Sequence, residues 1–350
     1  MKHKKILKFT FGFVFLFLVS LSYAGTDPCA FLKTGVGARA LGMGGAFVSI
    51  ADDATCTYWN PAGLVYIDRP TLGTMIQSLG NPEWESLRDI APTYQFINFI
   101  IPTNSLGLDH WGGSFGISWI HNGIDNIPHT YLDESGNIVR DSFSDSEDAY
   151  FISYGSGIFE NQLLIGGNLK ILRQEFTKIT DAKATGWDLD AGMIYSISDR
   201  TNIGLLLQKG ITLKWANGHI DKGPITARAG TSYKFINRER LHCLAACDLL
   251  QAKSHPLEGH FGGELGYMPQ PVKLSGNDLS LNKLSFRCGI DGIVLENRYG
   301  NIDQMNNHTN WTLGLGLNFH ILKQGLQIDY TFGSYRLGNK HRISFILEIL

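Results

Sequence analysis

The sequence predicts an all-β protein: a transmembrane antiparallel up-and-down β-barrel of about 14 strands with an N-terminal plug (hatch) segment. Three observations support this prediction. The chain opens with a secretion signal. Apolar and polar residues alternate from about residue 71 onward, and short connections between these alternating runs are interspersed with long ones. The predicted organisation is therefore a signal peptide at 1–24, a plug at 25–70 and a barrel at 71–350.

Residues 1–24 have the three parts of a secretory signal peptide. Lysines open the segment, an apolar run follows at 9–21, and Ser22-Tyr23-Ala24 supplies small residues around a cleavage site. The mature chain is then expected to begin at Gly25. A membrane anchor is the alternative, but the apolar run is short for a spanning helix. Cys29 lacks the preceding apolar and small residues of a lipid-attachment site.

The composition of the chain narrows the class of protein. Charged residues make up 18% of the 350 residues, the net charge is −2, and 40 residues are glycine. No basic stripe indicates a nucleic-acid partner. After the signal, no apolar run is long enough to span a bilayer as a helix, so a membrane protein of this sequence would have to be a barrel.

Alternation with a period of two defines the predicted strands. In 312–319, for example, Leu313, Leu315 and Leu317 share one face, whereas Thr312 and Gly316 share the other. The first face is expected to meet lipid, together with Ile328 and Phe332 of the next strand. The predicted strands are 71–78, 93–101, 111–121, 149–155, 162–174, 184–197, 201–208, 225–236, 240–250, 258–268, 282–291, 309–321, 324–334 and 341–350.

Alternation alone does not distinguish a membrane barrel from a soluble β-sandwich. The connections favour the barrel: short turns are predicted at 198–200, 237–239 and 323–325, and long loops at 122–148, 209–224 and 292–308. Outer-membrane barrels have short periplasmic turns and long external loops. The polar faces are also rich in Gly, Ser, Asn and Asp rather than Lys and Glu.

The segment between the signal and the first strand reads as a compact plug of turns and short helices. Its glycines permit close packing or positive φ. Asp52 and Asp53 suit the N-terminus of a short helix, which Asn60-Pro61 then ends. The residues that define this motif are Gly35, Gly37, Arg39, Gly42, Gly44, Gly45, Asp52, Asp53, Tyr58, Trp59, Asn60 and Pro61.

This motif resembles the N-terminal signature of the PorV/PorQ family, within the FadL-like superfamily of bacterial outer-membrane barrels. The end of the chain, His341-Arg342-Ile343-Ser344, resembles the last strand of the same family. The resemblance implies location in the outer membrane of a Gram-negative-type bacterium. It implies two alternative functions: FadL-like transport of hydrophobic molecules, which leads, or a PorV-like role in type IX secretion that binds and delivers cargo proteins.

No pattern in the sequence predicts an enzyme, a cofactor or a metal site. Motifs for zinc proteases, serine hydrolases and phosphate-binding loops are missing from the chain. Asp52 and Asp53 fit helix capping better than cation binding. Cys29 and Cys56 both fall in the plug and either pair or remain free, because sequence does not set connectivity.

The expected functional surface is a polar lumen that meets the plug. Arg39 is the expected plug-side partner of the wall carboxylates, because unpaired buried charges are costly. Phe31, Leu41, Met43, Phe47 and Trp59 either line an apolar path or pack the plug against the wall. Expected partners are membrane lipid, a hydrophobic small molecule, and cargo or secretion proteins. The predicted lumen residues are Asp188, Asp190, Arg228, Glu264, Arg287, Asp291 and Asp329.

Overall fold

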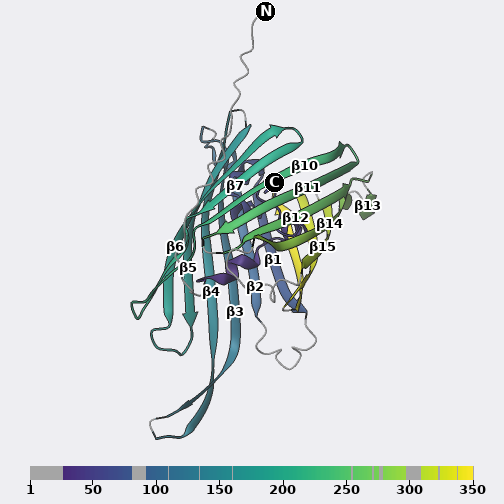
Figure 1. The fold of residues 1–350 in the computed structure, drawn as a ribbon. Coiled ribbons are helices and arrows are strands. Elements are labelled where there is room, and N and C mark those ends of the chain that lie inside the picture. Colours follow the sequence, from purple (N-terminus) through teal and green to yellow (C-terminus); the bar gives the residue numbers. More distant parts are fainter. Residues whose placement is uncertain are drawn as a thin grey trace, which may run out of the picture.

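Fourteen antiparallel strands close into one barrel around the N-terminal part of the chain (Figure 1). The computed structural model describes residues 27–80, 92–108, 110–133, 135–159, 161–253, 255–269, 272–275, 279–296, 309–321, 324–336 and 338–349. The predicted signal peptide at 1–24 lies outside these residues.

The wall strands follow one another in chain order, and the last one pairs with the first. They are β1 (Thr71–Gly80), β2 (Thr93–Pro102), β3 (Ser114–Leu132), β4 (Ile138–Ile158), β5 (Leu163–Phe176), β6 (Lys183–Ser198), β7 (Thr201–Gln208), β10 (Thr226–Arg238), β11 (Leu241–Ala252), β12 (Leu257–Tyr267), β14 (Leu279–Glu296), β15 (Asn310–Ile321), β16 (Gln324–Tyr335) and β17 (Gly338–Glu348). Pairing of Met75 in β1 with Ser344 in β17 closes the barrel. The predicted fold class and strand number are confirmed.

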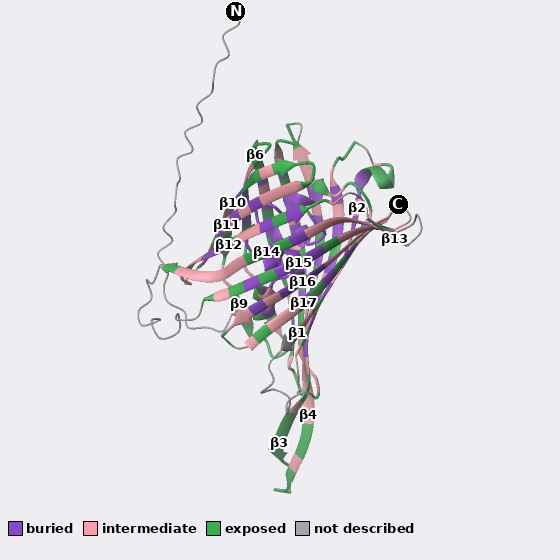
Figure 2. Ribbon diagram, turned by 90° about the vertical axis from the view of Figure 1, so that its right-hand side faces the viewer, coloured by how far each residue is buried: buried purple, intermediate pink, exposed green. Residues whose placement is uncertain are grey.

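Alternation along each wall strand separates lipid-facing from inward-facing side chains. In β15, Leu313 and Leu315 are half exposed, whereas Thr312 is buried. Figure 2 shows the same pattern as alternating colours along β10 to β17. This alternation follows from the two-residue repeat of a strand, which places successive side chains on opposite faces of the wall.

The prediction of a long loop at 122–148 is wrong, because most of this region is strand. β3 continues to Leu132 and β4 begins at Ile138, so the pair projects beyond the rest of the barrel (Figures 1 and 2). The pairing register shifts between Ile124 and Ile127, where Asn126 has φ 57°. This bulge reverses the inward and outward positions of β3, which hides the strand from a search for strict alternation.

Short strands also occur in the predicted loop 209–224 and in the connection between β12 and β14. β8 (Thr212–Trp215) and β9 (Ile220–Lys222) lie in the predicted loop 209–224, and β13 (Val272–Ser275) follows β12. We call the end of the barrel that holds the turns at 199–200 and 239–240 the short-turn end. The opposite end, from which β3 and β4 project, is the long-loop end.

The N-terminal segment, residues 27–70, lies inside the barrel and contains short helices. They are η1 (Ala30–Thr34), α1 (Ala38–Gly42), α2 (Cys56–Trp59) and η2 (Pro61–Tyr66); η4 (Thr103–Leu106) lies between β2 and β3. Within the described residues, no helix has the length and apolar character needed to cross a membrane. The stretch from Gly35 to Ala51 is buried throughout. The core of the molecule is therefore the contact between this segment and the inner wall.

Candidate functional site: the barrel lumen

The N-terminal segment is attached to the wall on all sides by hydrogen bonds. Backbone groups of the segment supply many of them: the amides of Phe47 and Val48 both donate to Asp248, at 2.9 and 3.0 Å. Because the short helices leave many backbone groups without internal partners, wall side chains satisfy them. The strands that contribute hydrogen bonds are β1, β2, β3, β5, β6, β7, β10, β11, β12, β15, β16 and β17.

The predicted glycine motif allows the segment to approach the wall backbone closely. Gly44 has φ 62°, and a Cβ placed there would lie 2.5 Å from the carbonyl oxygen of Ile290 in β14. Its amide donates to Thr312 Oγ1 at 3.2 Å. Gly44 therefore needs both the positive φ and the missing side chain. Gly35, Gly37 and Gly45 also have positive φ, and Gly42 packs against β15 and β16.

Asn60 and Pro61 hold the end of α2 against β6 and β7. α2 ends at Trp59, where the prediction put its end, and Asn60 is extended. The Asn60 amide donates to the carbonyls of Val48 at 2.8 Å and Met193 at 3.0 Å. Trp59 Nε1 donates to Val36 O at 2.9 Å, and Tyr58 lies edge-on to Trp59.

The predicted capping role of Asp52 and Asp53 is wrong in detail. α2 begins at Cys56 with Thr55 before it, and no side chain caps its first amides. Asp53 instead accepts from the amide and hydroxyl of Thr55, the residue directly before α2, at 2.9 and 2.6 Å. Asp52 pairs with Arg39 at 2.5 Å. Both carboxylates pair with the guanidinium of Arg39, a contact that spacing along the sequence does not reveal.

Arg39 joins the N-terminal segment to a layer of paired charges on β12, β14 and β16. Its Nε lies 2.9 Å from Glu264 Oε2, and Arg287 Nε lies 2.6 Å from the same oxygen. Arg287 Nη1 continues to Asp329 Oδ1 at 2.6 Å. We call Arg39, Asp53, Glu264, Arg287 and Asp329 the charged layer. All five are buried, and each ion has a partner of opposite sign, as buried charges require.

The other predicted lumen residues form separate clusters with residues that the sequence did not single out. Lys170 lies 2.7 Å from Asp190 and 3.3 Å from Asp188. Arg228 lies 3.5 Å from Asp248 and donates to Gly45 O at 2.7 Å. Lys170 and Asp248 each lie between two outward-facing apolar residues. The alternation of the sequence could therefore have placed both side chains on the inner face. The remaining predicted residue, Asp291, lies 3.0 Å from His260 Nδ1.

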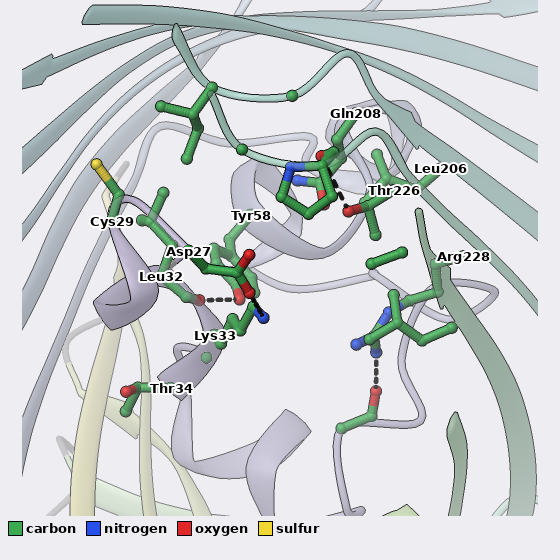
Figure 3. A pocket seen from close by; sticks show the side chains of 18 of the residues that line it. Asp27, Cys29, Leu32, Lys33, Thr34, Tyr58, Leu206, Gln208, Thr226 and Arg228 are labelled. Atoms are coloured by element: carbon green, nitrogen blue, oxygen red, sulfur yellow. Dashed lines mark hydrogen bonds and ion pairs between the residues drawn. The ribbon is translucent and has the colours of Figure 1, made fainter. Parts of the chain in front are cut away.

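A cavity of about 220 Å³ lies between the N-terminal segment and β5, β6, β7, β10, β11, β12 and β14, toward the long-loop end. In Figure 3, Cys29 and Leu32 lie on one side of it, and Leu206, Thr226 and Arg228 on the other. Of the predicted apolar residues, Leu41 and Trp59 line the cavity. Phe31, Met43 and Phe47 are buried in the packing of the segment instead.

Two ionisable groups that line the cavity are uncharged. Burial raises the pKa of the Cys29 thiol to about 12 and that of the Tyr58 hydroxyl to about 12. Tyr58 donates to Leu32 O at 2.5 Å (Figure 3). Cys29 and Cys56 are both free, so the open question of their pairing is answered. The cavity wall near η1 is thus neutral, apart from the pair of Lys33 with Asp27.

An apolar groove of about 560 Å³ lies on the outer surface of the same wall, over β10, β11, β12 and β14. Ala245, Gly263 and Cys288 are neighbours across three strands and form its floor, with Tyr233 and Phe261 beside them. On the inner face of this seam, His260 and Asp291 line the cavity. The β12–β14 pairing is interrupted here, because Asp291 and Gly292 form a bulge between Phe261 and Gly259.

The described residues contain no group of three or more His, Cys, Asp or Glu side chains that could hold a metal ion. Their chemistry is pairing of charges, hydrogen bonding and apolar packing.

Comparison with known proteins gives matches by fold. No protein-family model and no curated protein matches the sequence. The structure resembles the TodX deltaS2S3 mutant monoaromatic hydrocarbon channel, with a TM-score of 0.51, 12% identity, and coverage of 89% of this chain and 98% of that chain. It also resembles the Ralstonia pickettii toluene transporter TbuX, with a TM-score of 0.50, 11% identity, and coverage of 89% and 97%. At this level of identity the likeness shows that this chain and these two proteins share a fold.

Proposed function

We propose that this protein is a non-enzymatic outer-membrane channel for hydrophobic small molecules. Residues 1–24 act as a cleaved signal peptide, 25–70 as a hatch in the lumen, and 71–350 as the barrel. The observation that carries the proposal is the pair of spaces on opposite sides of one seam: the cavity inside β12–β14 and the apolar groove outside it. The neighbours named as hydrocarbon and toluene channels support the same function.

The charged layer supports a route through the side of the barrel rather than straight along its axis. Toward the short-turn end, Glu264 of the charged layer also contacts Lys283 and His242. The layer therefore contains paired ions on both the hatch and the wall. An apolar molecule that entered this layer would separate buried ion pairs, which is costly. Leaving the cavity through the seam would instead take the molecule past a single pair, His260 with Asp291, and then into the apolar groove and the bilayer.

The seam has features that allow this exit. The bulge at Asp291–Gly292 removes regular pairing from β14, and Gly292 has φ 69°. Gly262 and Gly289 place no side chain between the hatch and the wall, and Met43 and Gly44 pack directly on them. A small shift of the hatch would therefore change the support of the seam, whereas the neighbouring β11–β12 ladder is regular along its whole length.

The proposal is tested by filling the outer groove. Gly263 faces outward with space for a side chain, and Gly167 on β5 is an outward glycine with similar space, far from the seam. We expect Gly263→Phe to lower uptake of radiolabelled toluene by cells that carry this protein as their only hydrocarbon channel. Gly167→Phe should leave uptake unchanged. Equal uptake by both variants at equal surface abundance would contradict the proposed route.

A second candidate function, PorV-like delivery of cargo proteins, is favoured by the projecting β3–β4 hairpin. A free two-stranded hairpin is only marginally stable in water, yet this one exposes Leu132 and Ile138 at its tip. Its lumen-facing side carries a row of ring contacts that reaches the barrel mouth: Tyr131, His129, Phe143, Phe176 and Trp215. Exposed apolar surface of this kind marks a contact site for a partner.

Removing the hairpin separates the two functions. Replacing residues 124–145 by a two-residue Asn-Gly turn shortens β3 and β4 to the height of their neighbours. For a toluene channel we expect unchanged uptake, whereas a delivery protein should lose surface display of its cargo. Loss of toluene uptake with normal display would contradict this division of roles.

A further inference from the structure

Arg342 is an exception among the buried cations of the barrel. Four Arg and Lys side chains are buried in the described part of the chain: Arg39, Lys170, Arg287 and Arg342. The first three lie within 2.9 Å of a carboxylate oxygen. Arg342 is only 1% exposed, and no carboxylate of the described residues lies within 4.0 Å of it. A buried charge without a counter-ion is costly, so an anion bound beside Arg342 would be stabilised.

The surroundings of Arg342 supply neutral hydrogen-bond acceptors and a second cation, but no negatively charged acceptor among the described residues. Its Nε donates to Gln77 Oε1 at 2.7 Å and its Nη1 to the Tyr335 hydroxyl at 3.1 Å. Lys340 lies two residues earlier on the same face of β17. The Arg342 guanidinium carbon and Lys340 Nζ are 5.2 and 4.8 Å from the centre of the same Tyr335 ring. Two cations thus share one aromatic ring.

A neighbouring hydroxyl also lacks a partner. Tyr94 in β2 pairs in register with Gln77, which pairs with Arg342, so the three residues form one inward-facing row across β2, β1 and β17. Tyr94 is 2% exposed, and its hydroxyl is buried without a hydrogen-bond partner. Buried hydroxyls are rarely left unsatisfied. The row therefore contains an unused hydrogen-bonding group next to an uncompensated charge.

Asp291 is an acidic group whose charge acts on both Arg342 and Lys340, but its direct contacts are with other residues. It lies 3.0 Å from His260 Nδ1, and it accepts from the Tyr335 hydroxyl at 3.0 Å. Tyr335 thus stands between Asp291 and Arg342 and keeps the two charges apart. One carboxylate shared with His260 leaves Arg342 and Lys340 with an excess of positive charge.

We propose that Arg342, Lys340 and the Tyr94 hydroxyl form a binding site for an oxyanion, a phosphate or a carboxylate, on the inner wall of β2, β1 and β17. Guanidinium and ammonium groups form strong charge-assisted hydrogen bonds with such groups. The oxyanion comes either free from solution or as the head group of an amphiphile. This site is separate from the β12–β14 seam and does not depend on the proposed passage of neutral hydrocarbons.

The test measures anion binding to the full-length protein in a non-ionic detergent. Thermal unfolding and titration calorimetry are compared for inorganic phosphate, dodecyl phosphate, laurate and the neutral dodecanol. We expect a rise in melting temperature with the anionic ligands and none with dodecanol. Stabilisation by inorganic phosphate identifies a free anion as the ligand, and stabilisation by dodecyl phosphate or laurate alone identifies an amphiphile.

Variants connect the binding to the named residues. Arg342→Gln should weaken binding of the effective anion by about tenfold or more, and Arg342→Lys should retain part of it. Lys340→Gln, at a less buried position, provides a second variant with weaker binding. Arg173→Gln, an exposed cation paired with Glu175, is the matched control and should bind normally.

Stability without ligand gives an independent readout. If Arg342 lacks an anion, Arg342→Gln should raise or preserve the melting temperature of the ligand-free protein, whereas Arg39→Gln should lower it. The proposal is overturned if no anion stabilises the protein, or if Arg342→Gln binds as tightly as the natural chain. It is also overturned if Arg342→Gln destabilises the ligand-free protein as much as Arg39→Gln, because Arg342 would then already have its counter-ion.

Discussion

Individual residues of the lumen are fixed by the cost of leaving a buried group without a partner. Arg39 illustrates this, since it contacts Asp52, Asp53 and Glu264 while its side chain is 10% exposed. The guanidinium has five donors in a planar fork and can satisfy several carboxylates at once, which a lysine ammonium does less well. One side chain thus couples the hatch to the wall.

Removal of Arg39 should leave Asp52 and Asp53 without their counter-ion and Glu264 with Arg287 alone as its close partner. We expect Arg39→Ala to destabilise the folded protein by about 3–5 kcal/mol, the usual cost of breaking a buried ion pair on one side. Denaturant unfolding in detergent, followed by tryptophan fluorescence, measures the change. Arg173→Ala breaks an exposed pair with Glu175 and should cost less than about 1 kcal/mol. Equal losses would show that Arg39 is not buried in the working protein.

Gly44 should tolerate no side chain, because it needs both space and a positive φ. A Cβ there would collide with Ile290 of the wall, so Gly44→Val should displace the hatch and raise single-channel conductance in a planar bilayer. Gly107 has φ 71°, but a Cβ placed there would meet no atom within 4 Å, so Gly107→Val imposes backbone strain without the collision. A conductance rise of the same size in Gly107→Val would refute the role of close packing.

At the scale of single elements, strands decide which environment each side chain meets. β15 alternates between half-exposed leucines and a buried inner row, and the hatch rests on that inner row through Thr312. β3 begins as a wall strand and ends as part of a free hairpin, with a bulge between the two parts. One strand can therefore serve membrane, lumen and solvent.

Arginine on the lipid face of β15 should be costly. Leu315 is 50% exposed in the structure and faces outward, so Leu315→Arg near the bilayer midplane is expected to cost about 2–4 kcal/mol. Folding into lipid vesicles, measured against denaturant, gives the value. Leu132→Arg, at the tip of the projecting hairpin, should cost little because the side chain meets water. A similar cost at both positions would mean that β15 does not face lipid.

At the scale of the whole molecule, the hydrogen bonds that close the barrel differ from those that hold the hatch in its lumen. Each wall strand pairs with a wall strand on either side, whereas the hatch contacts side chains around the full circumference. The barrel ladder does not need the hatch to satisfy its backbone, because every wall strand has two neighbours. The hatch, by contrast, depends on the wall for its hydrogen bonds.

Deletion of residues 25–70 should therefore leave the barrel folded but open. We expect a large increase in planar-bilayer conductance, with heat-modifiable migration in gels retained as evidence of an intact barrel. Shortening the β3–β4 hairpin at 124–145 is the control, and it should leave the conductance of the closed lumen unchanged. An intact barrel with unchanged conductance after deletion of 25–70 would argue against a hatch that closes the lumen.

Sequence alone determined the strand number, the inward and outward faces and the close-packed glycines of the hatch. These properties follow from the two-residue repeat and from backbone conformation, which are local. The prediction failed at 122–148, because the bulge near Asn126 interrupts the repeat. It also failed for the cap at Asp53, where Thr55 takes the hydrogen bonds.

Only the tertiary structure decided which charges meet. Arg39 and Glu264 are 225 positions apart, and their contact depends on closure of the barrel around the hatch. The same closure places Arg342 beside Gln77, and among the described residues it brings no carboxylate within 4.0 Å of Arg342. The sequence could assign Glu264 to the inner face, but it could not identify the residue with which Glu264 pairs. Partner choice depends on strand register, on closure and on the position of the hatch, which no local pattern encodes.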